Sequence, residues 1–262
     1  MSPMLQVRGV TKAFDGFVAI DDVSLDIAPG TRHAVIGPNG AGKSTLFNLL
    51  SGAYVPDRGS VHFLGRSIAG LEPHAVVRMG MARSFQRVNI FARKTVTDNV
   101  AVACIARDNR HFRLFEPAQG LYQEESLALL ERVGLAGEAG LRAGELAYGK
   151  QKQLELAVSL AARPKLLMLD EPTAGMSMAE TRSLSALIGR LAQELGFTLL
   201  FTEHDMSVVF GIAERISVLH HGEIIAEGTP DEVRNDAEVR RVYLGQEVDA
   251  PHTAAPSVEQ RP

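Results

Sequence analysis

The sequence predicts an α/β fold in which helices cover a largely parallel β-sheet. Two observations predict it. Along most of the 262 residues, segments with the apolar pattern of strands alternate with segments of helical periodicity. In addition, the glycine-rich residues 37–42 lie between a short apolar strand and a helix, which is an order typical of proteins with parallel sheets.

The N-terminal part of the chain is predicted to begin with a β-hairpin. Residues 5–14 and 17–30 alternate apolar and polar side chains, and Asp15-Gly16 between them is a strong signal for a two-residue turn. The elements expected next are, in order, a buried strand at 31–37, a helix at 42–50, a strand at 59–65, a short helix at 73–80 and a strand at 81–86.

The middle of the chain differs from the parts on either side. Helical patterns at 95–106 and 123–135 flank an irregular polar stretch, and no strong strand pattern interrupts them. We therefore expect a helical subdomain over about residues 88–144. It would be inserted into a core formed by about residues 1–87 and 145–230.

The C-terminal part returns to alternating helices and strands. The expected elements are a helix from 147, a strand at 165–170, a helix at 180–195, a strand at 197–202, a helix from 205 and a hairpin at 215–228 that turns at His221-Gly222. A charged helical extension is expected at 231–246, so that the folded part spans residues 1–246. The polar, Pro-rich end, residues 247–262, is expected to form a disordered tail.

Composition argues against several classes of protein. With 45% hydrophobic and 22% charged residues the chain is an ordinary globular one, and its net charge of -4 does not favour nucleic-acid binding. Cys104 is the only cysteine, which rules out an internal disulfide and fits a reducing cytosol. No signal-peptide pattern begins the sequence, and no apolar run reaches the ~18 residues that cross a bilayer. Any work at a membrane is therefore expected from its cytoplasmic face, through partner proteins.

The segment GPNGAGKST, residues 37–45, predicts a phosphate-binding loop for ATP with Mg²⁺. It fits the pattern G-x-x-x-x-G-K-[ST] between a strand and a helix; without those flanks it would equally fit a chance glycine-rich turn. Backbone N–H groups of such a loop converge on phosphate oxygens. Lys43 is expected at the β- and γ-phosphates, the Ser44 hydroxyl on Mg²⁺, and Thr45 at a phosphate. The nucleotide-binding residues expected in the loop are Gly37, Pro38, Asn39, Gly40, Ala41, Gly42, Lys43, Ser44 and Thr45.

Two adjacent carboxylates, Asp170 and Glu171, end the apolar strand in KLLMLDEP. Transfer of a phosphoryl group to water needs one group that holds the metal and another that positions the attacking water. We assign Asp170 to Mg²⁺ and Glu171 to the water. Taken alone, the pair would equally fit a solvated strand end, but the phosphate loop in the same chain favours the catalytic interpretation.

The order of these motifs resembles that of the ATP-binding subunits of ABC transporters, over about residues 5–245. The resemblance implies a P-loop NTPase fold with an ABC-type core, an antiparallel β subdomain and a helical subdomain. It implies that Phe14 stacks on adenine, that Gln86 senses Mg²⁺ and the attacking water, and that His204 contacts the γ-phosphate. Each of these residues alone would more often have a structural role, and it is their joint order that makes the functional interpretation specific. The catalytic residues implied are Glu171, His204 and Gln86, and the metal ligands are Ser44, Gln86 and Asp170.

The segment LAYGK, residues 146–150, resembles the signature motif, which in this family contacts the ATP held by a partner subunit. Leu146 and Gly149 match the usual motif, but serine, glycine and glutamine are replaced by Ala147, Tyr148 and Lys150. The missing serine hydroxyl removes one hydrogen bond to a charged group, typically ~1.5–3 kcal/mol. Further along, Ser177 stands where the family often has an aspartate. Any weakness is therefore expected at the ATP bound by the partner's phosphate loop.

Three features resemble the branch of the family that serves branched-chain amino-acid uptake: the segment LAYGKQ, a lengthened helical region between about 107 and 122, and the ending RRVYLG, which lipopolysaccharide-export ATPases share. The resemblance implies an ATP-hydrolysing importer subunit on the cytoplasmic face of the inner membrane. The implied partners are a second, paralogous ATPase, two membrane permeases and a periplasmic or lipid-anchored solute-binding protein, without nucleic acid.

Other functions stay open on the sequence alone. The same architecture imports urea, short amides or aromatic acids, and the ATPase does not touch the solute. Lipopolysaccharide export is disfavoured by LAYGK and by the lengthened helical region. A soluble ABC ATPase of DNA repair or translation is disfavoured because the chain has no long coiled-coil insert and no second ATPase domain. A non-hydrolysing regulator is disfavoured because Glu171 and His204 are both present.

Overall fold

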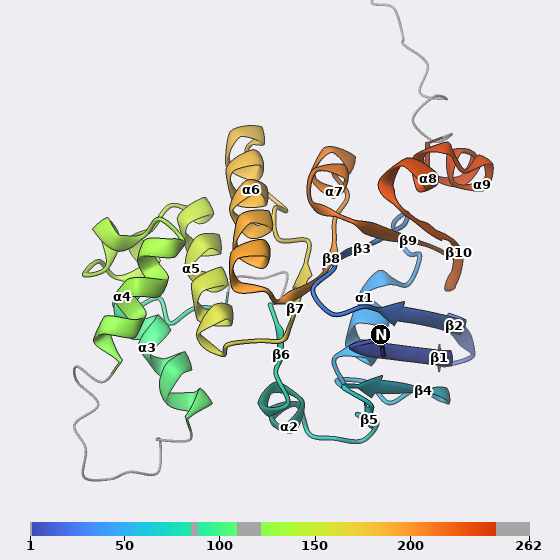
Figure 1. Ribbon diagram of the computed structural model, residues 1–262, viewed down its shortest axis with the longest axis horizontal. Helices are drawn as coiled ribbons and strands as arrows, with labels where there is room; N and C mark the ends of the chain where they lie inside the picture. The colour runs from blue at the N-terminus through green and yellow to red at the C-terminus, as the bar shows by residue number, and fades with distance from the viewer. Residues whose placement is uncertain (1, 85–88, 109–121, 245–262) are drawn as a thin grey trace, which may run out of the picture.

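Two β-sheets organise the part of the chain that the computed structural model describes, which comprises residues 2–84, 89–108 and 122–244. The smaller sheet is antiparallel, and the larger one is mostly parallel. Helices α3 and α4 lie at one end of the molecule in Figure 1, and the smaller sheet lies at the other end. This arrangement matches the fold class that the sequence predicts.

The smaller sheet has the strand order β2-β1-β4-β5. Its strands are β1 (Leu5–Phe14), β2 (Phe17–Ile27), β4 (Arg58–Phe63) and β5 (Arg66–Ser67). Alternating positions of β1 and β2 point into the core, which explains their apolar-polar pattern. Asp15 and Gly16 join β1 to β2 with positive φ angles of 47° and 87°, so the predicted hairpin is confirmed.

The larger sheet has the order β10-β9-β3-β8-β7-β6. Its strands are β3 (Arg32–Ile36), β6 (Met81–Arg83), β7 (Leu166–Asp170), β8 (Thr198–Thr202), β9 (Arg215–His220) and β10 (Glu223–Gly228). All neighbours run parallel except the hairpin of β9 and β10, which turns at His221-Gly222 as predicted. The carboxyl ends of β3, β7 and β8 therefore meet at one edge of the sheet, where ligands of α/β proteins usually bind.

Helices follow the parallel strands and cover the sheet. They are α1 (Lys43–Leu50) after β3, α2 (Pro73–Arg78) before β6, α6 (Met178–Leu195) after β7 and α7 (Met206–Ile212) after β8. Asp205 caps α7, since its side chain accepts a hydrogen bond from the backbone N–H of Ser207 at 2.8 Å. The helix predicted from residue 205 is confirmed.

A second group of helices consists of α3 (Val96–Arg107), α4 (Gln123–Arg132) and α5 (Tyr148–Ala161), with short 3₁₀ turns η2 (Ala136–Glu138) and η3 (Ala143–Glu145). Helix α3 begins with a reciprocal capping box between Thr95 and Asp98. No strand lies among the described residues of this group. None of the described helices is long and apolar enough to pass through a bilayer.

The C-terminal extension is more broken than the sequence predicts. Instead of one helix, the chain forms α8 (Pro230–Asn235), α9 (Ala237–Val239) and a π-helical turn η4 (Arg240–Leu244). Asp236 causes the break, because its backbone is extended and its carboxylate caps the backbone N–H groups of Glu238 and Val239. The predicted tail, residues 247–262, lies outside the described residues.

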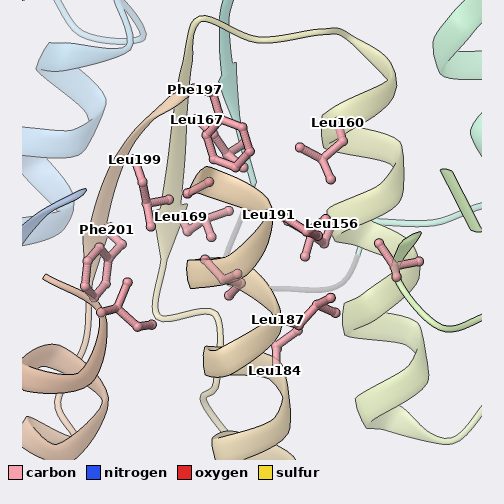
Figure 2. Close-up of a cluster of buried hydrophobic side chains, with 14 of the residues drawn as sticks. Leu156, Leu160, Leu167, Leu169, Leu184, Leu187, Leu191, Phe197, Leu199 and Phe201 are labelled. Atoms are coloured by element: carbon pink, nitrogen blue, oxygen red, sulfur yellow. The ribbon is translucent and has the colours of Figure 1, made fainter. Parts of the chain in front are cut away.

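Leucines from α5 and α6 pack against β7 and β8 to form one apolar cluster (Figure 2). The labelled members are Leu156, Leu160, Leu167, Leu169, Leu184, Leu187, Leu191, Phe197, Leu199 and Phe201. Each is at most 8% exposed, and burying one such side chain contributes about 1.5–3 kcal/mol. The cluster fixes helix α5 on strand β7, and so fixes the start of α5 relative to the end of β7.

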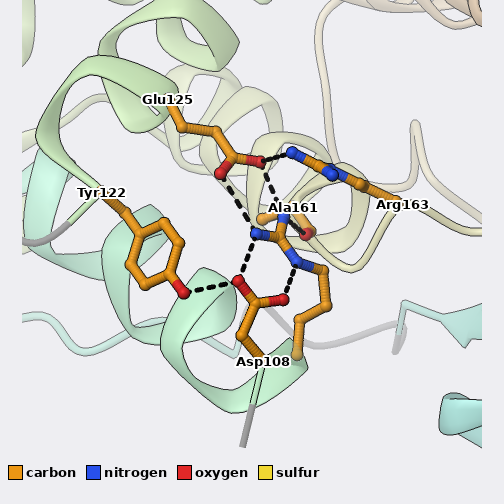
Figure 3. A network of polar contacts seen from close by, with 6 residues as sticks. Asp108, Tyr122, Glu125, Ala161 and Arg163 are labelled. Atoms are coloured by element: carbon orange, nitrogen blue, oxygen red, sulfur yellow. Dashed lines mark hydrogen bonds and ion pairs between the residues drawn. The ribbon is translucent and has the colours of Figure 1, made fainter. Parts of the chain in front are cut away.

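A polar cluster around the Arg107 side chain joins α3, α4 and α5. Figure 3 labels its other members. The Arg107 guanidinium donates to Glu125 at 2.6 Å, to the carbonyl of Ala161 at 2.9 Å and to Asp108 at 2.8 and 2.9 Å. The Tyr122 hydroxyl donates to Asp108 at 2.5 Å. We call these residues, with Arg163 bonded to Glu125, the Arg107 cluster. The cluster thereby links Asp108 and Tyr122, the described residues on either side of 109–121.

Candidate active site

The loop between β3 and α1 has the shape of an anion-binding turn. Strand β3 ends at Ile36 and helix α1 begins at Lys43, so the backbone N–H groups at the start of α1 face the end of the sheet. Gly42 precedes the helix with a φ of 105°, which favours glycine. A Cβ at Gly42 would lie 2.6 Å from the carbonyl oxygen of Ala19, and a Cβ at Gly37 would lie 2.1 Å from that of Leu219. Both positions therefore require glycine.

The hairpin between β9 and β10 supports this loop from behind. The backbone N–H of Gly222 donates to the carbonyl of Ala41 at 2.9 Å. The carbonyl of Gly222 accepts from the backbone N–H of Asp21 at 2.9 Å. The turn thus connects the loop to strand β2 through backbone hydrogen bonds.

Lys43 is buried, and its ammonium group donates to the carbonyls of Gly37 at 2.6 Å and Pro38 at 3.0 Å. Burial lowers the pKa of Lys43, although the negative charges of Glu171 and Asp170 oppose the shift. An anion at the loop would favour the charged form of this lysine. Lys43 thus lies between the loop and the two carboxylates at the end of β7.

Asp170 ends strand β7 with 8% exposure. Its carboxylate accepts from the Thr202 hydroxyl at 2.7 Å on strand β8 and from Arg83 at 3.4 Å on strand β6. Arg83 also donates to Asn48 of α1 at 2.7 Å. These bonds hold the Asp170 carboxylate at the same edge of the sheet as the phosphate loop.

Glu171 has an unusual backbone conformation, with a φ of 48°. A side-chain-bearing residue in this left-handed region is strained and needs support from its surroundings. Its backbone N–H donates to the Thr202 hydroxyl at 3.1 Å and to the Thr202 carbonyl at 3.2 Å. Its carboxylate lies 2.6 Å from Nε2 of His204, which follows β8. The structure thus brings Glu171 and His204 into direct contact.

Phe14 lies at the end of β1 and is 39% exposed. Its ring meets the ring of Tyr54 edge to face, with centroids 5.5 Å apart. Both rings are exposed enough to offer a surface to a flat apolar group. Gln86, which is expected to sense Mg²⁺ and the attacking water, lies outside the described residues.

The signature segment, residues 146–150, begins helix α5. Ala147 is the N-cap and makes no side-chain cap, in agreement with the hydroxyl that the sequence lacks. Leu146 is buried, and Lys150 forms an ion pair with Glu138. The backbone N–H groups of the first turn of α5 have no partners within the helix, so they can receive an anion.

Tyr148 connects the signature segment to the loop after the carboxylates. Its hydroxyl donates to the carbonyl of Ala174 at 3.2 Å. Gly149 lies beside Glu180, because a Cβ there would be 2.8 Å from that carboxylate. Ser177, which stands in place of the aspartate, caps helix α6 in a reciprocal box with Glu180. The starts of α5 and α6 are therefore in contact.

Four residues near the site escaped the sequence analysis: Tyr54, Arg83, Thr202 and Glu203. Tyr54 contacts Phe14 across 40 residues of chain, and Arg83 contacts Asp170 across a gap of 87. No local pattern reveals such pairs. The sequence does place Thr202 at the end of a predicted strand, with Glu203 directly after it. Only the structure shows that β8 pairs with β7, which brings both residues to the site.

The oxygen groups at this edge suit Mg²⁺, which prefers hard oxygen ligands and keeps several waters. Ser44 is exposed on the first turn of α1, and the Asp170 carboxylate faces the same edge of the sheet. No cluster of three or more His, Cys, Asp or Glu side chains suited to a metal occurs in the described part of the chain. Two protein ligands with water and phosphate oxygens would complete a magnesium site, so the residues fit the ion.

Comparison with known proteins adds to this geometry. The family model described as ABC transporter matches residues 20–174, and the model described as branched-chain amino acid ATP-binding cassette transporter matches residues 223–249. The chain is 40% identical over 93% of its length to the branched-chain amino acid transport protein LivG of Salmonella typhimurium, covering 98% of that protein. It is 41% identical over 93% of its length to BraF of Pseudomonas aeruginosa, with 98% of BraF covered.

A solved structure supports the same assignment. The chain resembles the ADP conformation of MJ1267, an ATP-binding cassette of an ABC transporter, with a TM-score of 0.82 and 30% identity. That match covers 94% of this chain and 100% of the other. Fold, site geometry and sequence similarity agree over nearly the whole length. The chain therefore belongs to the ABC transporter family, as one of its ATP-binding, ATP-hydrolysing proteins.

Proposed function

We propose that this chain is the ATPase subunit that powers uptake of branched-chain amino acids, acting on the cytoplasmic face of the inner membrane. The relatives LivG and BraF are named as branched-chain amino acid transport proteins. The family model for branched-chain amino acid cassettes matches residues 223–249 of this chain. One observation supports the ATPase role above all: Lys43, Asp170 and the Glu171–His204 pair lie together at one edge of the sheet.

In the proposed site, the phosphates of ATP lie against the backbone N–H groups of residues 37–45, and the Lys43 ammonium turns from the loop carbonyls to the β- and γ-phosphates. Phe14 stacks on adenine. Ser44, Asp170 and Gln86 would hold Mg²⁺, which would offset the charge that develops on the phosphates.

The proposed chemical step centres on Glu171. Its carboxylate orients a water in line with the γ-phosphate and accepts a proton from it. His204 holds Glu171 through Nε2 and donates to the γ-phosphate once that group arrives. The short distance between Glu171 and His204, 2.6 Å, supports this pairing.

The proposed partners are a second, paralogous ATPase, two permeases and a solute-binding protein that is periplasmic or lipid-anchored. The two ATPases face each other head to tail, so residues 146–150 of this chain contact the ATP of the partner. In this proposal, residues 88–144 form the helical subdomain between the two parts of the core, 1–87 and 145–230. Binding of ATP closes the pair, and hydrolysis reopens it.

The test is uptake of labelled leucine, with labelled urea in parallel, in cells without this gene and in cells complemented with the wild type or with Lys43→Ala. Lys165→Ala is a matched control, since Lys165 is exposed at the opposite end of strand β7. The proposal predicts that leucine uptake is lost, is restored by the wild type and the control, and is not restored by Lys43→Ala. Unchanged leucine uptake with lost urea uptake would contradict the solute assignment.

A further inference from the structure

Glu203 is a buried carboxylate for which the proposed mechanism has no role. It is 3% exposed and lies between the last residue of β8, Thr202, and His204. Burying a carboxylate is costly unless hydrogen bonds compensate it. A residue placed there at such a cost calls for an explanation in terms of the groups that it binds.

The groups that bind Glu203 come from both loops of the site. Its Oε1 accepts from the backbone N–H of Thr173 at 2.9 Å and from the Thr173 hydroxyl at 2.7 Å. Its Oε2 accepts from the backbone N–H of His204 at 3.2 Å. Thr173 follows Glu171 by two residues, so one carboxylate spans the loop that carries Glu171 and the loop that carries His204.

The chemistry of the three donors requires a carboxylate. All three are N–H or O–H groups, and an ionised carboxylate only accepts hydrogen bonds, on both of its oxygens. Glutamine has the same shape, but its NH₂ group would face one of these donors. Burial raises the pKa of Glu203, and the charge of Glu171 adds to the shift, whereas the bonds from Thr173 and His204 oppose it.

The Glu171–His204 contact is supported from two sides. Thr202 holds the strained backbone of Glu171 at the end of the sheet. Glu203 holds the chain beyond Glu171 and the backbone of His204. Without Glu203, the two loops would be joined above the sheet mainly through the Glu171 and His204 side chains themselves, which must also act on the nucleotide.

We propose that Glu203 is a positioning residue that connects the two loops through Thr173 and the backbone of His204, and so keeps Glu171 and His204 in register for hydrolysis. This inference rests on the proposed function, because it assigns to Glu171 and His204 the roles given there. Glu203 is buried and both of its oxygens accept hydrogen bonds from protein groups, so it is not expected to contact the nucleotide. Its loss is therefore expected to lower the rate of the chemical step and to leave ATP binding nearly intact.

The test compares Glu203→Gln and Thr173→Val with the wild type, in the full chain purified with its transporter complex. Thr173→Val keeps the shape of the side chain and the backbone N–H, and it removes only the hydroxyl donor. Thr173→Ser restores that donor. The matched control is Glu232→Gln, which removes a carboxylate that accepts from the backbone N–H of Thr229 at 2.7 Å on α8, away from the site.

Turnover is measured per bound ATP, so that unfolded protein does not count. We expect kcat to fall about 10-fold in Glu203→Gln and in Thr173→Val, with less than about a 3-fold change in KM for ATP. Thr173→Ser is expected to recover most of the rate, and Glu232→Gln to keep it. Equal turnover per bound ATP in Glu203→Gln, Thr173→Val and the wild type would overturn the proposal, because a purely structural role lowers only the number of competent sites.

A double-mutant cycle with His204→Ala tests whether Glu203 affects hydrolysis through the Glu171–His204 pair. If Glu203 acts through the Glu171–His204 pair, Glu203→Gln changes single-turnover hydrolysis less than about 2-fold once His204 is gone. Multiplicative losses would contradict that route. Glu171→Gln separates the two hypotheses: normal turnover in that variant refutes the proposed site, whereas slow turnover there with normal turnover in Glu203→Gln refutes only the role of Glu203.

Discussion

At the scale of single residues, one strained backbone position lies where the chemistry is proposed. Glu171 has a positive φ of 48°, and its N–H is held by Thr202. Such a conformation costs on the order of 1–3 kcal/mol and persists only when neighbours fix it. With this backbone conformation, the Glu171 carboxylate contacts His204 beyond the end of the strand. This position is consistent with a group that must contact a water outside the sheet.

Replacing Glu171 with glutamine tests the role of its charge. The amide keeps the shape and one acceptor but cannot take a proton, so we expect ATP binding to persist and turnover to fall by about 10²-fold or more. The measurement is steady-state ATP hydrolysis alongside equilibrium binding of a labelled nucleotide. Turnover near that of the wild type would refute the assignment of Glu171 as the base.

Ala147→Ser restores the residue that is usual in the signature motif. Ala147 is the N-cap of α5 with an extended backbone, a conformation in which serine caps a helix and adds about 1 kcal/mol. We therefore expect thermal stability to rise slightly and turnover of the complex to stay equal or increase. A large loss of turnover would show that the alanine is specifically required.

Residue-level prediction from the sequence succeeds where a motif is local. The loop of residues 37–45 lies as expected between β3 and α1, and Asp170 and Glu171 lie as expected at the end of β7. It fails for Arg83 and Glu203, because their partners lie far along the chain. A buried carboxylate such as Glu203 is visible only once the packing around it is known.

At the scale of secondary-structure elements, strand β3 is joined to β9 by a buried polar pair. Nε2 of His33 lies 2.8 Å from the Ser217 hydroxyl, and His33 is 1% exposed. Burial, together with the positive charge of Arg215, lowers the pKa of His33 to about 4. The neutral imidazole is thus the form that the folded sheet holds.

This pair predicts a pH dependence of stability. The unfolded chain binds a proton at a pKa near 6.5 and the folded chain only near 4, so stability falls as the pH drops from about 6.5 to 4. The loss is at most about 3 kcal/mol. We expect His33→Gln, which cannot titrate, to lack this contribution. Urea unfolding from pH 4 to 7 measures it, and parallel curves for the two proteins would contradict the assignment.

Element boundaries show where sequence patterns stop being informative. The alternation in β1 and β2 and the turn at Asp15-Gly16 depend on near neighbours, and both are confirmed. The C-terminal extension has a helical composition throughout, yet Asp236 caps a new helix there instead of continuing the first. Aspartate competes with the helix backbone for hydrogen bonds, and only the local geometry decides the outcome.

At the scale of the whole molecule, the Arg107 cluster adds polar contacts between α3, α4 and α5, three helices that also share the apolar core. The Arg107 side chain is 14% exposed and its partner Glu125 25%, so the pair is partly shielded from water. We expect Arg107→Met to lower the free energy of unfolding by about 1–3 kcal/mol, since it leaves Glu125 and Asp108 without their main donor. Urea unfolding of the full chain measures the change.

Arg163→Met is the control for that prediction. Arg163 binds the same Glu125 at 2.9 Å, but its side chain is 70% exposed. Exposed ion pairs contribute about 0–1 kcal/mol, so this variant is expected to unfold almost like the wild type. Equal losses in the two variants would mean that burial of Arg107 does not strengthen its bonds.

The strand order has a consequence for how the protein is made. Strand β3, which leads into the phosphate loop, lies between β8 and β9, and Arg32 pairs with Leu199. The loop is therefore synthesised early, but the two strands that flank β3 are both complete only once residue 220 has been synthesised. Contacts that span so much chain form slowly and leave apolar strands unpaired in the meantime. The nascent protein consequently cannot complete its ATP site until the ribosome has passed residue 220.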